Sequence, residues 1–171
     1  YTNISAFYMQ RKILICRHGE AEDLYPLQPD FERELTLRGA QQARDTGVWL
    51  RENFRKVDKI IASPAKRTSQ TARIIASKLY YDEEQIDYQP DLYNAKEHKL
   101  VQSISQVPEQ SKVILLVGHN PGITKLARDL TDTMVGYLDT AQVVAVEITL
   151  ESWEQIHYIT GSVAAASNMQ V

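Results

Sequence analysis

The sequence of 171 residues contains a single cysteine, Cys16, so no disulfide can form within the chain. Disulfide-dependent folding in an oxidising compartment is therefore not implied. Long hydrophobic runs are also missing, since the longest, VILLVG at residues 113–118, is far too short to span a bilayer. The first residues, YTNISAFYMQRK, lack the basic start and apolar stretch of a signal peptide. These features predict a cytoplasmic protein without a membrane segment.

Basic residues are not in excess, because 19 Lys and Arg stand against 22 Asp and Glu, and the formal net charge is −3. This balance argues against a dedicated nucleic-acid-binding protein, whose surface would carry a basic stripe. The nucleotide-binding pattern G-x-x-x-x-G-K-[ST] is absent, as are H-x-H, H-E-x-x-H and paired cysteines, which bind metal ions. We therefore expect no metal, no other cofactor and no nucleic-acid partner.

The chain does contain an alternation of apolar runs with amphipathic segments, and no internal repeat. Apolar and alternating runs predict strands at 12–16, 58–63, 112–118, 142–150 and 153–159, the last two forming a hairpin. Periodicity of the helical kind predicts helices at 35–53, 68–80, 98–107 and 121–131. Thr36 is the expected N-cap of the first helix.

Strand–helix alternation of this kind predicts an α/β fold. We expect a three-layer sandwich, with a mainly parallel central sheet and helices on both faces. The length fits one domain over residues 1–171, with a core at about 11–160 and loose ends at 1–10 and 161–171.

Reactive side chains follow three of the predicted strands. Arg17 and His18 come after the first strand, Arg67 follows the second, and His119 and Asn120 follow the third. Because ligands of such sheets bind at the carboxyl ends of the strands, we expect these side chains to converge. Two guanidinium groups suit a phosphate dianion, and the helices that begin after Arg67 and Asn120 would add backbone N–H groups. The pattern predicts an anion pocket.

His18 has the chemistry of a nucleophile, because neutral imidazole can attack phosphorus through one ring nitrogen. The other nitrogen must keep its proton, typically by donating to a backbone carbonyl, and Gly19 permits the tight turn that this needs. His119 would donate to a phosphoryl oxygen in the transition state. Taken alone, either histidine could be structural. Cys16 is expected to be a buried strand residue, since Glu22 stands where the cysteine-phosphatase pattern C-x5-R needs arginine.

Four segments, RHGEAE, LTLRGAQQA, SPAKRTSQTA and VGHNPGI, resemble in order the motifs of the histidine phosphatase (phosphoglycerate mutase-like) superfamily. The chain is short, and so is the stretch between the Arg67 helix and the His119 strand. In both respects the chain looks most like the SixA-type phosphohistidine phosphatases. The resemblance covers roughly residues 11–160. It implies that His18 is transiently phosphorylated before water releases phosphate, and that no metal takes part. It also implies a phosphate pocket formed by Arg17, Arg67 and His119, to which we add Gly19 and Asn120.

The sequence leaves the proton donor open. Many members of the superfamily carry a glutamate after the third strand, where this chain has Asn94 in PDLYNAKEHK. Glu20 and Glu97 are the candidate donors, and further acids follow His18 on the same loop: Glu22, Asp23 and Asp30. A weak set of acids suits phosphohistidine, because a protonated imidazole leaves phosphorus more readily than an alkoxide does.

We therefore expect a phosphatase that acts on phosphohistidine in a protein partner. A pocket without a lid insertion would be open to a phosphoryl group carried by a protein. Two alternatives remain: a phosphatase of small phosphate esters or nucleoside phosphates, and a non-catalytic phosphate-binding adaptor on the same fold. The sequence does not predict the oligomeric state.

Overall fold

The computed structural model describes residues 8–167. A mixed sheet of six strands in the order β3-β2-β4-β1-β5-β6 forms its middle layer. The strands are β1 (Met9–Arg17), β2 (Lys59–Ala62), β3 (Asp87–Tyr88), β4 (Val113–Gly118), β5 (Val143–Leu150) and β6 (Ser162–Ala166). Strands β3, β2, β4 and β1 pair in parallel, whereas β5 and β6 are antiparallel additions at one side. The sheet is thus mainly parallel, as predicted.

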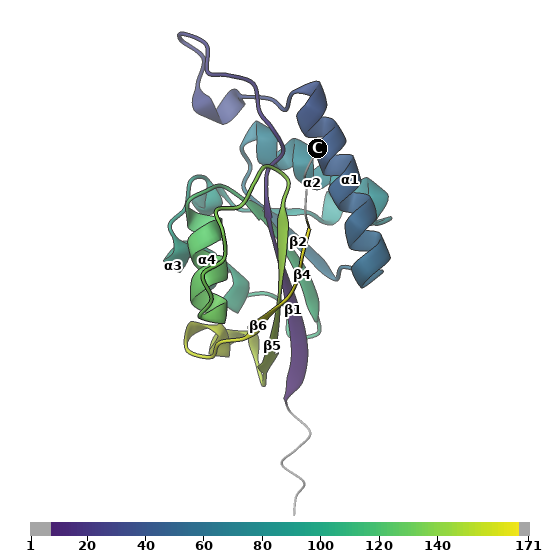
Figure 1. Ribbon diagram of the computed structural model, residues 1–171, viewed down its shortest axis with the longest axis vertical. Helices are drawn as coiled ribbons and strands as arrows, with labels where there is room; N and C mark the ends of the chain where they lie inside the picture. Colours follow the sequence, from purple (N-terminus) through teal and green to yellow (C-terminus); the bar gives the residue numbers. More distant parts are fainter. Residues whose placement is uncertain (1–7, 168–171) are drawn as a thin grey trace, which may run out of the picture.

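Helices cover both faces of this sheet (Figure 1). One face carries α1 (Leu37–Phe54) and α2 (Lys66–Lys78), and the other carries α3 (Glu97–Ser105) and α4 (Gly122–Thr131). Short 3-10 turns, η2 (Asp30–Glu32), η3 (Glu83–Gln85), η4 (Pro90–Leu92) and η5 (Trp153–His157), lie in the connections. The prediction of a three-layer α/β sandwich is confirmed. No helix within residues 8–167 is long and apolar enough to cross a membrane, and the cytoplasmic location stays a prediction.

The consecutive apolar residues of β1 supply both halves of the core. Ile13 and Ile15 lie in the hydrophobic cluster on the side of α3 and α4, whereas Leu14 and Cys16 lie in the cluster on the side of α1 and α2. All four side chains are fully buried. Successive side chains of a strand point to opposite faces, so an unbroken apolar run is what a strand covered on both sides requires.

The structure corrects the predicted ends of the chain. Residues 153–157 form the 3-10 turn η5, not a strand, because Trp153 and Ile156, three positions apart, are the two that point inward. The hairpin partner of β5 is instead β6, within a segment expected to be loose. The sequence of β6, SVAAA, consists mostly of small side chains and shows no alternation of apolar and polar residues, so it was not predicted as a strand. At the other end Met9 and Gln10 belong to β1, while 1–7 and 168–171 lie outside the described residues.

Candidate active site

The register of the parallel strands brings the predicted site residues together. Arg17 at the end of β1 pairs with Gly118 at the end of β4, and Ala62 at the end of β2 pairs with Val117 of β4. The residues that follow these three strands are His18, Ser63 and His119. They therefore meet at one edge of the sheet, and the rings of His18 and His119 lie 5.5 Å apart between centroids.

A pocket of about 430 Å³ opens at this edge. It is lined by residues from several separate parts of the chain: Arg17, His18, Glu20, Ala21, Asp30, Arg33, Arg67, Asn94, His119, Asn120, Tyr137 and Thr140. All four residues predicted to form the catalytic centre are among them, as are Asn120 and Glu20. Three arginines against two carboxylates make the lining positive on balance, which favours an anionic ligand.

His18 is held in the tautomer that nucleophilic attack needs. Its Nδ1 lies 2.7 Å from the carbonyl oxygen of Gly19. A carbonyl only accepts, so Nδ1 carries the proton and Nε2 keeps its lone pair. Burial lowers the pKa of His18 to about 4, and the charges of Arg67 and Arg17 act in the same direction. The ring is therefore neutral at physiological pH.

The loop after His18 is fixed by a close approach of two glycines. A Cβ on Gly19 would lie 2.5 Å from the carbonyl oxygen of Gly39, and a Cβ on Gly39 would lie 2.0 Å from the carbonyl oxygen of Glu20. Gly39 is in the first turn of α1, whose predicted N-cap is confirmed, because its amide donates to Thr36 Oγ1 at 2.9 Å. Larger residues at 19 and 39 would separate the nucleophile's loop from α1.

His119 is paired on one side of its ring only. Nε2 lies 2.8 Å from the hydroxyl oxygen of fully buried Ser63, and Nδ1 has no partner within residues 8–167. Ser63 Oγ also accepts from the amide of Ala65 at 3.3 Å, and within residues 8–167 the ring of His119 is the one acceptor for the proton of this hydroxyl. Donation from Ser63 to Nε2 therefore satisfies both groups and leaves Nδ1–H as a donor. Burial, then the charge of Arg67, lowers the pKa of His119 to about 3.

The two predicted arginines are anchored from behind. Arg17 Nη1 donates to the carbonyl oxygen of Leu138 at 3.0 Å. Arg67, only 3% exposed, donates through Nη1 to the carbonyl oxygen of Asp30 at 2.8 Å and through Nη2 to its carboxylate at 3.0 Å. In the described part of the chain, both arginines keep a buried Nε–H without a partner. Both guanidinium groups line the pocket, where their positive charges favour an anion.

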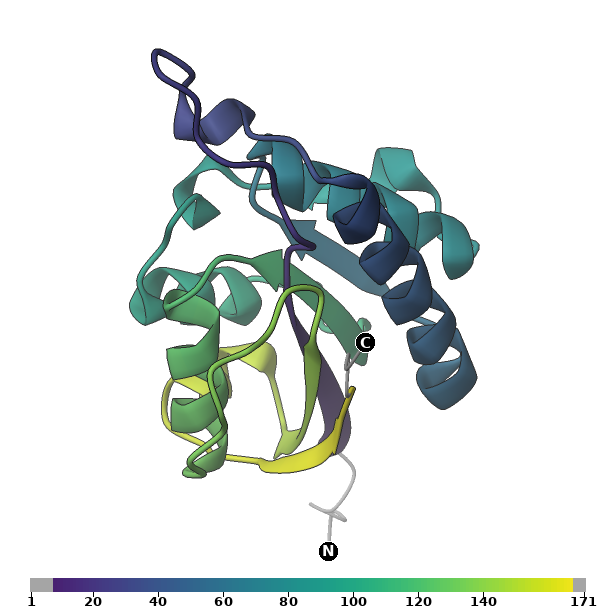
Figure 2. The same ribbon diagram turned by 45° about the horizontal axis from the view of Figure 1, so that its top comes forward.

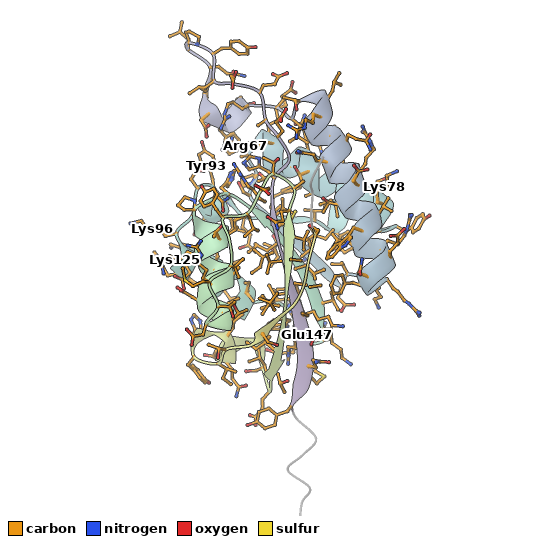
Figure 3. All side chains as sticks on the ribbon, in the orientation of Figure 1. Arg67, Lys78, Tyr93, Lys96, Lys125 and Glu147 are labelled. Atoms are coloured by element: carbon orange, nitrogen blue, oxygen red, sulfur yellow. The ribbon has the colours of Figure 1, made fainter. Side chains whose placement is uncertain are left out.

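Asp30 organises one wall of the pocket. Besides Arg67, it accepts a hydrogen bond from the hydroxyl of Tyr93 at 2.5 Å and one from Arg33 Nε at 2.9 Å. Burial opposes ionisation, but Tyr93 and Arg67 hold the pKa of Asp30 far below its ordinary value. Figure 3 labels Arg67 and Tyr93 close together below the projecting loop. Tyr93 also places its ring edge-on to His119, with centroids 5.5 Å apart.

The structure changes the set of candidate proton donors. Glu97, at the start of α3, lies outside the pocket lining and forms an ion pair with Lys125 at 2.8 Å, so the structure does not bring it to the pocket of His18. Glu22 and Asp23 are exposed and also lie outside the lining, and Asp30 is held ionised. Glu20 does line the pocket. Its carboxylate accepts a hydrogen bond from the hydroxyl of Thr36 and forms an ion pair with Arg38 Nη1 at 2.8 Å.

Sequence reasoning missed four contributors: Ser63, Arg33, Tyr93 and Tyr137. Ser63 is the first residue of the quoted SPAKRTSQTA segment and the last residue of a predicted strand, so its position could have been noticed. Arg33 and Tyr93 belong to loops with no periodic signal. Cys16 is the buried strand residue that was expected, and burial raises the pKa of its thiol to about 12. It therefore offers no competing nucleophile.

About half of the chain matches a known protein family. The model of the histidine phosphatase superfamily (branch 1) matches residues 13–96. The mitochondrial serine/threonine-protein phosphatase Pgam5 of Drosophila ananassae is 41% identical over 76 residues, which cover 44% of this chain and 26% of that protein. The chain thus spans about a quarter of the length of this curated relative.

Solved structures share the fold over nearly all of the chain. The putative phosphohistidine phosphatase SixA from Nakamurella multipartitia has a TM-score of 0.78 at 22% identity, covering 94% of this chain and 96% of that one. A protein histidine phosphatase SixA in complex with tungstate has a TM-score of 0.79 at 19% identity, covering 92% and 96%. Residues 13–96 thus match the histidine phosphatase superfamily, and the fold that these solved structures share extends over nearly all of the chain.

Proposed function

We propose that this chain is a phosphatase that acts through a phosphohistidine intermediate on His18. The observation that carries the proposal is the 2.7 Å hydrogen bond from His18 Nδ1 to the carbonyl oxygen of Gly19. It directs the free lone pair of Nε2 away from that carbonyl in a ring that stays neutral. Binding a phosphate group alone would call for donors, whereas this ring offers an acceptor atom, which is what a nucleophile requires.

The reaction has two displacement steps at phosphorus. Arg17 and Arg67 bind phosphoryl oxygens, and His119 donates to a third oxygen from Nδ1. His18 Nε2 attacks phosphorus, so an N–P bond forms while the bond to the leaving atom breaks and its electron pair departs with that atom. Water then attacks phosphorus, the N–P bond breaks, its pair returns to Nε2, and the proton of water leaves with inorganic phosphate or solvent.

We propose phosphohistidine in a protein partner as the substrate. Neither carboxylate in the pocket lining is set up as an acid: Asp30 is held ionised, and Glu20 is engaged by Thr36 and Arg38. A leaving imidazole needs less protonation than an alkoxide, so a pocket of this kind suits it. Similarity to proteins named as phosphohistidine and serine/threonine-protein phosphatases supports a phosphoprotein substrate.

The test combines one variant with a panel of substrates. His18→Ala should abolish hydrolysis, and acid-labile phosphate should be trapped on the wild-type protein but not on this variant. His98→Ala, at an exposed histidine outside the pocket, is the matched control and should behave as wild type. A chelator should leave the rate unchanged, because no step uses a metal.

Each alternative has its own outcome on that panel. Full activity of His18→Ala refutes the mechanism. Faster turnover of alkyl or nucleoside phosphates than of phosphohistidine and phosphoramidate favours the small-molecule phosphatase. Tungstate or vanadate binding without turnover of any compound favours the phosphate-binding adaptor.

A further inference from the structure

The segment between His18 and α1 forms an arm, defined here as residues 20–36. It projects beyond the rest of the molecule in both ribbon views, at the top of each picture (Figures 1 and 2). Its two limbs are held together, because the amide of Glu22 donates to the carbonyl oxygen of Glu34 at 2.8 Å and Ala21 forms an antiparallel bridge with Leu35. The arm is therefore a braced structure, not a loose connection.

The tip of the arm presents large apolar side chains to solvent. Leu24 is 56% exposed, Tyr25 is 61% exposed and Leu27 is fully exposed. Single exposed apolar residues are ordinary on protein surfaces, but three within four positions at the end of a projection form a patch. None of the three contributes its apolar surface to the core.

The backbone at the tip is also unusual for these residues. The amide of Gln28 donates to the carbonyl oxygen of Tyr25 at 3.1 Å, which closes a turn with Pro26 second and Leu27 third. Leu27 has φ of 67°, in the left-handed region that glycine or asparagine normally occupies at this position of a turn. A leucine here costs stability and gains no burial, so the folded state of this chain does not account for its presence.

The base of the arm forms part of the phosphate pocket. Glu20 and Ala21 line the pocket from one limb, and Asp30 and Arg33 line it from the other. Tyr25 lies four positions after Ala21 along the chain, which corresponds to at most about 13 Å at the rise of a strand. A small phosphate ester held in the pocket cannot reach the tip. A protein whose phosphorylated side chain enters the pocket is large enough to contact the arm at the same time.

We propose that the tip of the arm, Leu24, Tyr25 and Leu27, docks on the protein that carries the phosphoryl group to His18. This inference rests on the proposed function and names the class of substrate as macromolecular. The partner would present an apolar patch within about 13 Å of its phosphorylated residue. Basic groups beside that patch would complement Glu22 and Asp23, which are exposed next to the tip.

The experiment compares a protein substrate with a small one. The variant Leu24→Ser/Tyr25→Ser/Leu27→Ser is assayed on a histidine-containing phosphotransfer domain, phosphorylated with phosphoramidate, and on phosphoramidate itself. We expect kcat/KM for the domain to fall at least about tenfold through KM, as loss of central apolar contacts does in interfaces. Turnover of phosphoramidate should stay within about twofold of wild type, because none of the three side chains lines the pocket.

A matched control removes equally exposed apolar side chains elsewhere. Tyr80, Met134 and Tyr158 are 85%, 86% and 73% exposed, and none lies in the arm. Replacing these three with serine should leave kcat/KM for both substrates unchanged. If this control lowers turnover of the domain as much as the arm variant does, the effect is one of general surface apolarity and the proposal is overturned.

Other outcomes also decide the question. Equal losses on both substrates would mean that the tip acts through the shape of the pocket, and unchanged turnover of the domain would mean that the tip contacts nothing; either overturns the proposal. A wild-type dimer that the arm variant dissociates in sedimentation would assign the tip to a second copy instead. Binding of the unphosphorylated domain is measured in parallel, so docking is decided even if no substrate is hydrolysed and the proposed function fails.

Discussion

The two buried histidines of the pocket make the stability of the fold depend on pH. Burial lowers the pKa of His18 from 6.5 to about 4 and that of His119 from 6.5 to about 3. In the unfolded chain both rings regain their ordinary values. Between pH 6.5 and about 4 the unfolded state therefore binds protons that the folded state does not, so stability falls as the pH falls through this window.

As long as the two rings stay neutral in the folded protein, the pKa of about 6.5 in the unfolded chain sets the size of the change in stability. At pH 5.5, one unit below this pKa, protonation of the unfolded chain lowers the free energy of unfolding by about 1.4 kcal/mol per histidine relative to pH 7.5. The two rings together cost about 3 kcal/mol at pH 5.5, a large part of the roughly 5–15 kcal/mol that holds a domain folded. The free energy of unfolding of the ligand-free protein therefore falls in mild acid, because the folded state keeps both histidine rings neutral.

Urea unfolding at pH 7.5 and 5.5 measures this difference. His18→Gln and His119→Gln should each reduce the pH dependence of the unfolding free energy by about 1.4 kcal/mol, and the double variant by about twice that. His98→Gln, at an exposed position, controls for loss of an imidazole and should retain the wild-type pH dependence. NMR titration of the ring protons tests the cause directly. Two rings in the pocket that titrate near pH 6.5 in the folded protein would refute the reasoning.

Three further substitutions test the supports of the site. Ser63→Ala should lower kcat about tenfold to a hundredfold with little change in KM, because His119 loses the group that fixes its tautomer. Ser63→Thr keeps a hydroxyl at this position and should recover part of the lost kcat. Gly39→Ala should destabilise the fold by about 1–3 kcal/mol in thermal unfolding, while Gly136→Ala, with nothing near its Cβ, should stay within about 0.5 kcal/mol. Thr36→Ala should cost about 1 kcal/mol in urea unfolding through loss of the α1 cap.

The centre of the site could be predicted because it sits where local patterns end. Apolar runs locate β1, β2 and β4, and the residues directly after a parallel strand are delivered to one edge whatever the loops do. The positions of two strands were enough to place Arg17, His18 and His119 at this edge. Placing Arg67 also required the start of a helix, because Arg67 lies in the first turn of α2.

The parts that sequence reasoning missed depend on contacts between distant loops. Asp30 reaches Arg67 across 37 positions and accepts from Tyr93 across 63. Neither segment has a periodic pattern, so no local signal tells which carboxylate faces the pocket. Glu97 was chosen as a donor by its distance along the chain from Asn94, but the start of α3 turns it toward Lys125 instead. Proximity in sequence is a weak guide within irregular loops.

The anchoring of the arginines explains how the pocket can bind an anion without rearranging. Terminal nitrogens of Arg67 are held by Asp30, and a terminal nitrogen of Arg17 is held by the carbonyl oxygen of Leu138. Each guanidinium is therefore oriented before any ligand arrives, and both line the pocket. Donors fixed in advance need no reorganisation as negative charge develops on the phosphoryl oxygens. Asp30 thus serves as a permanent partner that orients Arg67, and its ionised state makes it a poor source of the proton.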